Sequence, residues 1–147
     1  MKQTARFLMV LLLVLAGTLA VASAEKPGDI FDASAWQCER AYMEIFFEEE
    51  GYKVFIEWGS SAWESRQWEY SCYLDQKTGT LVSLPLGSCT DVIYADDGTV
   101  KSYTTRYVDG SAQFSMDDQG YLIWKDLKED AGRDMRFERV PLPAMEN

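Results

Sequence analysis

The chain has 147 residues, contains no histidine and carries a formal net charge of −10 at pH 7. Without histidine it can form no Ser-His-Asp triad, no Cys-His pair and no histidine-ligated zinc site, which excludes most hydrolase designs. The negative charge repels phosphate backbones and anionic lipids, so we expect no nucleic-acid partner and no membrane partner.

Residues 1–24 have the order of a secretory signal peptide. Lys2 and Arg6 precede an apolar run, and small residues ending at Ala24 follow it. This order predicts cleavage near Ala24 and a secreted or extracytoplasmic location. The alternative is a retained membrane anchor, because residues 7–24 are uncharged and a spanning helix needs about 20 such residues.

The remaining chain is expected to fold as a single domain. Two of the 14 basic residues and none of the 24 acidic residues lie in the predicted signal, so 123 residues with a net charge of −12 remain. This length is normal for one domain with one core. Residues 25–35 lack periodicity and are expected to be a flexible lead-in to the domain at 36–147.

Three cysteines remain after export, and disulfides persist in oxidising compartments. We expect Cys38 to pair with Cys72, closing a loop of about 35 residues that is worth about 4 kcal/mol in the chain-entropy model. Pairing of Cys72 with Cys89 is the alternative, at about 3 kcal/mol. The leftover thiol is expected to be buried as a small apolar group.

From residue 40 onward, apolar and polar residues alternate, which predicts antiparallel strands. The first predicted hairpin turns at the segment Glu48-Glu49-Glu50-Gly51 and places apolar pairs on one face. These pairs are Phe47 with Tyr52, Ile45 with Val54, Met43 with Ile56, and Ala41 with Trp58. The other face carries mixed pairs and is a candidate cavity lining or protein contact, with Tyr42 opposite Glu57, Glu44 opposite Phe55, and Phe46 opposite Lys53.

Further turns are predicted along the chain. A second hairpin turns at residues 77–79, with Trp68, Tyr70 and an inward-pointing Cys72 before it and Thr80, Val82 and Leu84 alternating after it. Residues 95–98 separate a strand ending at Tyr94 from one beginning at Val100. Asp109-Gly110 predicts a two-residue hairpin loop, because glycine accepts positive φ. That loop would align Tyr107 with Ala112, Thr105 with Phe114, and Tyr103 with Met116.

The C-terminal part is expected to continue this pattern. Residues 117–120 predict a turn that brings Phe114 near Ile123 and Met116 near Tyr121. Residues 127–132 are the one place for a short helical turn, with Gly132 as its stop. A final strand, residues 135–140, ends before Pro141.

The predicted fold is therefore an all-β antiparallel meander of about nine strands. Consecutive hairpins favour a lipocalin-like up-and-down β-barrel. A β-sandwich is the alternative; it is less favoured because its Greek-key connections need longer crossings between strands.

Aromatic residues are unusually frequent, with five Trp, eight Tyr and seven Phe. The segment after the second predicted strand carries Trp58, Ser60, Ser61 and Trp63, and we interpret it as a ligand-binding platform at the barrel mouth. The alternative is that Trp63 folds back as a lid over the core. We predict no catalytic residue, no cofactor and no metal site, since most carboxylates fall in predicted turns, where Asp is favoured.

Two resemblances follow from short motifs. Trp36-x-Cys38, Trp58-Gly59-Ser60-Ser61-Ala62, Tyr70-x-Cys72 and residues 128–132 together resemble a group of uncharacterised small secreted bacterial β-proteins. Tyr70-x-Cys72, Gly110-Ser111-Ala112-x-Phe114 and Trp124-Lys125 resemble small-barrel periplasmic lysozyme inhibitors. The second resemblance implies that Ser111 and Lys125 contact a target enzyme, although the spacing differs and Asp126 stands where that family has Gly.

These observations favour an exported, monomeric, non-enzymatic binding module that holds a small ligand or a protein at a barrel mouth or open face. The alternative is an acidic inhibitor of a basic secreted enzyme such as lysozyme. A carboxylate-based glycan hydrolase is the remote third alternative, supported only by the abundance of acidic residues.

Overall fold

The structure is a computed structural model that describes residues 30–143. The expected signal peptide lies outside the described residues. Within them there is no helix of the length and hydrophobicity needed to cross a bilayer. The described chain forms ten strands, β1 (Ser34–Cys38), β2 (Ala41–Glu48), β3 (Gly51–Gly59), β4 (Glu64–Asp75), β5 (Thr80–Ser83), β6 (Gly87–Tyr94), β7 (Val100–Gly110), β8 (Ala112–Met116), β9 (Leu122–Asp126) and β10 (Glu138–Val140).

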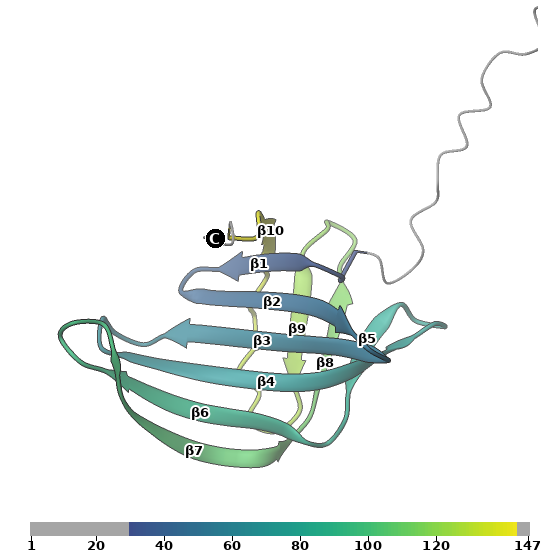
Figure 1. Ribbon diagram of the computed structural model, residues 1–147. Coiled ribbons are helices and arrows are strands. Elements are labelled where there is room, and N and C mark those ends of the chain that lie inside the picture. Colours follow the sequence, from purple (N-terminus) through teal and green to yellow (C-terminus); the bar gives the residue numbers. More distant parts are fainter. Residues whose placement is uncertain (1–29, 144–147) are drawn as a thin grey trace, which may run out of the picture.

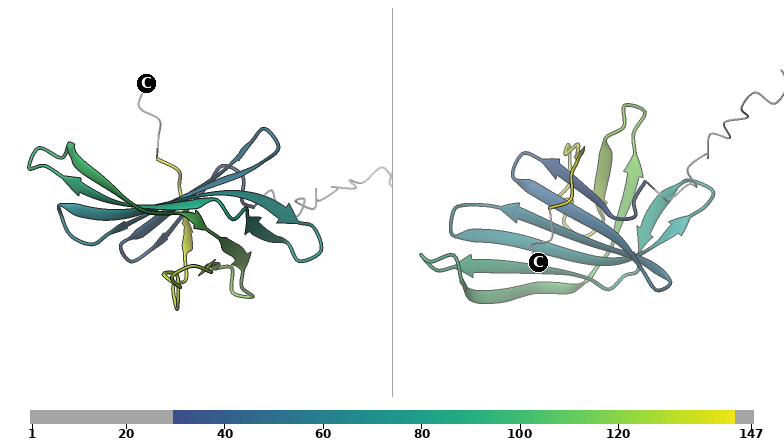
Figure 2. Two further views of the ribbon diagram at one scale, coloured as in Figure 1. Left: turned by 90° about the horizontal axis from the view of Figure 1, so that it is seen from below. Right: turned by 45° about the horizontal axis from the view of Figure 1, so that its top comes forward.

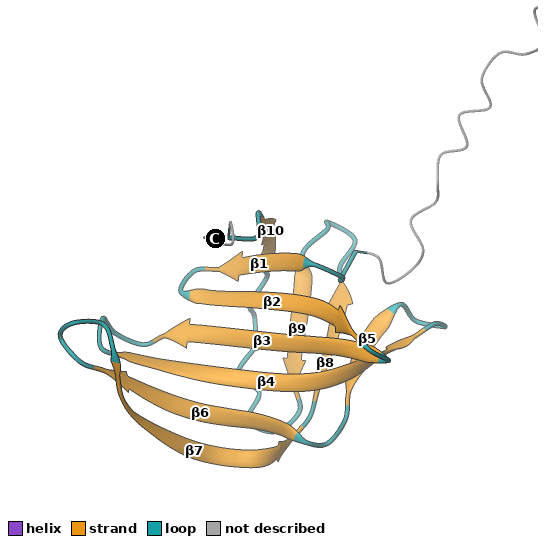
Figure 3. Cartoon of the chain, viewed as in Figure 1, coloured by secondary structure: helices purple, strands orange, loops and turns teal. Residues whose placement is uncertain are grey.

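The strands form one antiparallel sheet that curls into a half-barrel (Figures 1 and 3). Its order is β10-β1-β2-β3-β4-β5-β8-β9, and β6 and β7 branch from β4. The branch arises because β4 is long: residues 64–69 pair with β6, whereas residues 72–75 pair with β5. The predicted all-β, barrel-like fold is confirmed, with ten strands rather than about nine.

The core lies between the concave face of the long sheet and the β8–β9 pair. Trp68 of β4 and Trp124 of β9 meet there edge to face, with ring centroids 5.0 Å apart. The C-terminal segment closes this layer, because Phe137 bridges to Leu122 and β10 then pairs with β1. Figure 2 shows, in its left view, the C-terminal part lying chiefly on one side of the sheet. Other large core side chains are Phe31, Trp36, Met43, Ile45, Ile56, Tyr70, Leu81 and Phe114.

The first predicted hairpin is confirmed in register. β2 and β3 pair Ala41 with Trp58, Met43 with Ile56, Ile45 with Val54, and Phe47 with Tyr52. The inward direction of Cys72 beside Trp68 and Tyr70 is also confirmed, since all three are buried. The predicted break at residues 95–98 is confirmed, because β6 ends at Tyr94 and β7 begins at Val100.

The predicted hairpin at Asp109-Gly110 is wrong. β7 runs through both residues and pairs with β6, while β8 pairs with β5 and β9. Gly110 is not among the glycines with positive φ. Its lack of a side chain serves close packing instead, because an added Cβ would lie 2.6 Å from Cε2 of Tyr107.

Two predicted strand phases are shifted by one residue. The turn at residues 117–120 forms, but it pairs Phe114 with Trp124 and Met116 with Leu122. On β5 the buried residues are Leu81 and Ser83, so the apolar alternation at Thr80, Val82 and Leu84 does not mark the core face. In each of these strands a polar residue occupies a buried position, so the pattern of apolar residues does not show which face is buried. In β5 this residue is Ser83, whose hydroxyl accepts a hydrogen bond from the Ala112 N–H. In β9 it is Asp126, which is 3% exposed.

Both ends of the domain differ from the sequence prediction. Residues 30–35 were expected to be a flexible lead-in, but Phe31, Ser34 and Ala35 are buried and β1 begins at Ser34. Residues 127–132 form turns and no helix. The final strand is shorter than predicted, because pairing starts at the Phe137 bridge and β10 covers only three residues.

The predicted disulfides are absent, and all three cysteines are free thiols. The strand registers place Cys38 in the cross-strand row of Arg66, six residues from Cys72 along β4. Cys89 lies opposite Trp68, four residues from Cys72. At about 3.3 Å per residue these offsets are about 20 and 13 Å, whereas a disulfide joins Cα atoms about 4.4–6.8 Å apart. With no disulfide formed, no single thiol is left over: Cys72 and Cys89 are both buried, and Cys38 is partly exposed.

Candidate functional site

The concave face of the half-barrel is only partly covered. β8, β9 and the C-terminal segment pack over the half that contains Trp68, and the other half remains open. A cleft of about 460 Å³ lies in this open half. We call it the concave cleft; it is lined by Trp58, Ser60, Glu64, Ser65, Arg66, Asp91, Val92, Ile93 and Thr104.

A single cross-strand row forms the floor of the concave cleft. Trp58 of β3 pairs with Arg66 of β4, Arg66 with Asp91 of β6, and Asp91 with Thr104 of β7. The row lies on the same face as the core residues Ala41 and Trp68, because pairing and alternation keep these positions in phase. The same alternation of side chains along the strands therefore places residues both in the core and on the floor of the cleft.

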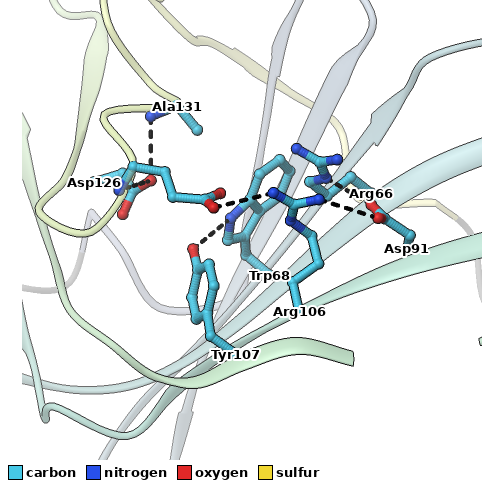
Figure 4. Close-up of polar contacts among 8 residues, drawn as sticks. Arg66, Trp68, Asp91, Arg106, Tyr107, Asp126 and Ala131 are labelled. Carbon is cyan, nitrogen blue, oxygen red and sulfur yellow. Dashed lines mark hydrogen bonds and ion pairs between the residues drawn. The ribbon is translucent and has the colours of Figure 1, made fainter. Parts of the chain in front are cut away.

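The charged groups of this row are fixed by one another (Figure 4). Arg66 Nε donates to Asp91 Oδ1 at 2.6 Å, and Arg106 Nη1 donates to Asp91 Oδ2 at 3.4 Å. Arg106 Nη2 also donates to Glu129 Oε1 at 3.1 Å, which ties β7 to the loop after β9. Two arginines and two carboxylates thus form a neutral network whose side chains are about one-third exposed.

The network sets the protonation of Asp91 and Arg106. Burial opposes ionisation of Asp91, but hydrogen bonds and charge from Arg66 and Arg106 outweigh it and lower the pKa of this carboxyl. Hydrogen bonding and charge from Glu129 raise the pKa of Arg106. Asp91 therefore remains a carboxylate that orients two guanidinium groups, while the Arg66 Nη atoms make no hydrogen bond among the described residues.

The four residues of the predicted ligand platform do not line one common site. Trp58, with an exposed fraction of 36%, and Ser60 line the concave cleft. Ser61 lines a separate shallow hollow with Arg40, Gly59 and Ala62. Trp63 is half exposed on the β3–β4 loop, so it forms no lid over the core. Its carbonyl accepts from the Tyr94 N–H, and it lines neither hollow.

The structure brings the two predicted inhibitor contacts onto one surface. Ala112 and Asp126 point into the core, so Ser111 and Lys125 lie on the outer face of the β8–β9 pair. Lys125 pairs with Gln113, and the Ser111 carbonyl accepts from the Leu127 N–H. The two residues are therefore near neighbours, and they lie on a different surface from the concave cleft.

The described residues form neither a metal centre nor an activated thiol. No group of three or more Cys, Asp or Glu side chains within residues 30–143 is arranged to hold a metal ion. Burial raises the pKa of Cys72 to about 12 and that of Cys89 to about 11, so neither thiol is an activated nucleophile. Two carboxylates, Glu64 and Asp91, line the concave cleft. The lowered pKa of Asp91 is the opposite of what a general acid requires.

Among the residues that line the concave cleft, Trp58 and Ser60 belong to the platform predicted from the sequence, whereas Arg66, Asp91 and Thr104 were not predicted. Arg66 meets Asp91 through the pairing of β4 with β6, which are not consecutive strands, and Asp91 in turn pairs with Thr104 of β7. A signal was nevertheless present, because Arg66 lies two residues before the inward Trp68. A charged residue in the inward phase of a strand marks a place where the core ends or a site begins.

Comparison of the chain with protein-family models, with curated proteins and with solved structures found no match. The function is therefore inferred from the geometry of the chain itself.

Proposed function

We propose that the protein is an exported, non-enzymatic binding module that holds a small ligand in the concave cleft. The observation that carries this proposal is the row of Trp58, Arg66 and Asp91, which sets an aromatic surface beside fixed polar groups. Small-molecule sites are typically concave, about 300–1,000 Å³ in volume, and combine apolar lining with a few oriented polar groups.

The lining also indicates what kind of ligand fits. Trp58 and Ile93 offer exposed apolar surface, while Arg66 has unused N–H donors directed by its bond to Asp91. Because the charged network is already neutral, the ligand needs no net charge to bind. A ligand with one apolar face and hydrogen-bond acceptors on its edge satisfies both requirements.

Native mass spectrometry of the secreted protein, followed by ligand titration monitored by tryptophan fluorescence, tests the proposal. We expect a retained ligand in the wild type, and Trp58→Ala should weaken its binding by about tenfold or more. Trp63→Ala is the matched control, since Trp63 is similarly exposed but lies outside the cleft lining. Absence of any ligand, or an equal effect of both substitutions, would contradict the proposal.

A second candidate is the acidic inhibitor of a basic secreted enzyme such as lysozyme. The placement of Ser111 and Lys125 together on the outer face of β8 and β9 favours it. A lysis assay with micromolar protein, repeated with Ser111→Ala and Lys125→Ala, separates the two candidates. Inhibition that these substitutions abolish supports the inhibitor, and unchanged lysis rejects it.

A further inference from the structure

The opposite, outer face of the sheet carries a second recess that the ligand proposal leaves unused. Strand registers place two rows side by side there: Glu44, Phe55, Glu69 and Ser88 in one row, and Phe46, Lys53 and Ser71 in the next. Two hollows of about 390 and 300 Å³ adjoin over these rows and share Glu48, Lys53 and Ser71. We call the joined recess the outer groove.

Large apolar side chains stand exposed along the outer groove. Phe46 is 37%, Tyr73 51%, Leu84 45% and Leu86 71% exposed, and all four line one of the two hollows. Leu84 and Leu86 belong to the β5–β6 connection, which is held against β4 by a hydrogen bond from the Leu84 N–H to the Ser71 carbonyl. Clustered exposed apolar residues rimmed by charge are typical of a protein contact.

The charge of the outer groove is strongly one-sided. Five glutamates line it, namely Glu44, Glu48, Glu49, Glu50 and Glu69, against one cation, Lys53. Within residues 30–143, none of these glutamates forms an ion pair, and Lys53 Nζ donates to the Ser71 hydroxyl at 2.6 Å. Glu44 accepts from the Tyr42 hydroxyl at 2.8 Å; burial and this carboxylate raise the pKa of Tyr42 to about 12.

We propose that the outer groove docks a cationic segment of a partner protein in which Lys or Arg alternates with large apolar side chains. The basic groups would face the unpaired glutamates while the apolar groups contact Phe46, Tyr73 and Leu86. Charge complementarity favours this occupant over the others: a second copy of this chain carries a formal net charge of −10 and is repelled, as are nucleic acid and anionic lipid. A small inorganic cation would leave the apolar surface uncovered.

Fluorescence anisotropy with a labelled synthetic peptide of about 12 residues that alternates Lys and Leu tests this docking site. The comparison peptides replace every Leu by Ser or every Lys by Glu. We expect the Lys-Leu peptide to bind, and to bind more weakly at about 150 mM than at 20 mM salt, because screening reduces the attraction between charges at the protein surface. Binding of the Lys-Ser peptide should be weaker by about tenfold, and the Glu-Leu peptide should not bind.

Variants locate the site on the surface. Glu48→Gln combined with Glu69→Gln, and separately Leu86→Ser, should each weaken binding by about tenfold. Asp96→Asn combined with Asp118→Asn is the matched control, since it removes the same charge from exposed turns outside the groove. The control and Trp58→Ala should each change the affinity less than about twofold. Failure of the Lys-Leu peptide to bind, or equal losses in the control, overturns the proposal without affecting the concave cleft.

Discussion

Gly87 of β6 and Gly110 of β7 lie opposite each other, and each faces an aromatic ring. A Cβ added at Gly87 would overlap the ring of Tyr70, and one added at Gly110 would lie 2.6 Å from Tyr107 Cε2. Tyr70 is buried and packs against Phe114, with ring centroids 5.7 Å apart, so it has little room to retreat. This glycine pair lets the end of the β6–β7 branch approach the core.

Gly87→Ala is expected to destabilise the protein by about 1–3 kcal/mol, because the added methyl forces the Tyr70 ring out of a packed core. Chemical denaturation followed by tryptophan fluorescence measures the change. Gly59→Ala is the control, since the nearest atom to its added Cβ is 4.0 Å away. A Gly87→Ala variant as stable as the Gly59→Ala control would show that the sheet does not need this close approach.

Asp126→Ala should lower the free energy of unfolding by about 2–3 kcal/mol. Asp126 is buried, and its carboxylate accepts from the backbone N–H groups of Lys128, Glu129 and Ala131 at 3.0–3.2 Å. Without it these donors lose their acceptor, and the loop that positions Glu129 against Arg106 loosens. Asp109→Ala, which removes only an exposed ion pair with Lys128, should have a much smaller effect. Equal effects would contradict the assignment.

The ion pairs of Asp91 predict a pH-dependent stability. Its folded-state pKa is lowered, so its contribution is fully present above the unfolded value of about 4 and is lost as the pH falls through the folded value. Asp91→Asn should therefore be less stable than the wild type at pH 7, and the difference should shrink toward pH 2.5. Because the side chains are one-third exposed, the difference at pH 7 should be at most about 1 kcal/mol. A gap that is constant or wider in acid would contradict this prediction.

The free cysteines predict a graded reactivity. At pH 8 in the native protein, iodoacetamide should modify Cys38 first, because it is partly exposed whereas Cys72 and Cys89 are buried with pKa values raised to about 12 and 11. Unfolding should expose all three thiols. Intact mass before and after reduction checks the result, and a gain of about 2 Da on reduction would show an intramolecular disulfide instead.

The strand register can be predicted from the sequence where two local signals agree. In the β2–β3 hairpin the turn and the apolar pairs specify the same register, and a shift by one residue would turn every side chain to the other face. The predicted hairpin at Asp109-Gly110 is wrong because the pairing of β8 with β5 overrides a strong local turn signal. The hairpin signal is local, whereas that pairing joins Leu81 to Phe114 and is invisible in a short window.

The candidate site shows the same contrast between local sequence signals and long-range strand pairing. Trp58 lies at the end of β3 and Ser60 just after it, so a single clearly marked strand is enough to draw attention to both residues. Arg66 and Asp91 were missed because their meeting depends on β6 returning to β4 after β5 has left it. The disulfide prediction failed for a related reason, since inward phase alone says nothing of how far apart two thiols lie along their strands.

The pairing of β1 with β10 brings Ala35 opposite Val140, so the first and last strands of the domain are direct neighbours. A peptide linker of a few residues can therefore join them, since paired strands lie only about 5 Å apart. A circular permutant with new termini at the exposed turn between Asp96 and Asp97 should fold to the same half-barrel. Such a permutant would place a fused reporter at the turn between β6 and β7, while the linker would join the original termini beside the paired strands β1 and β10.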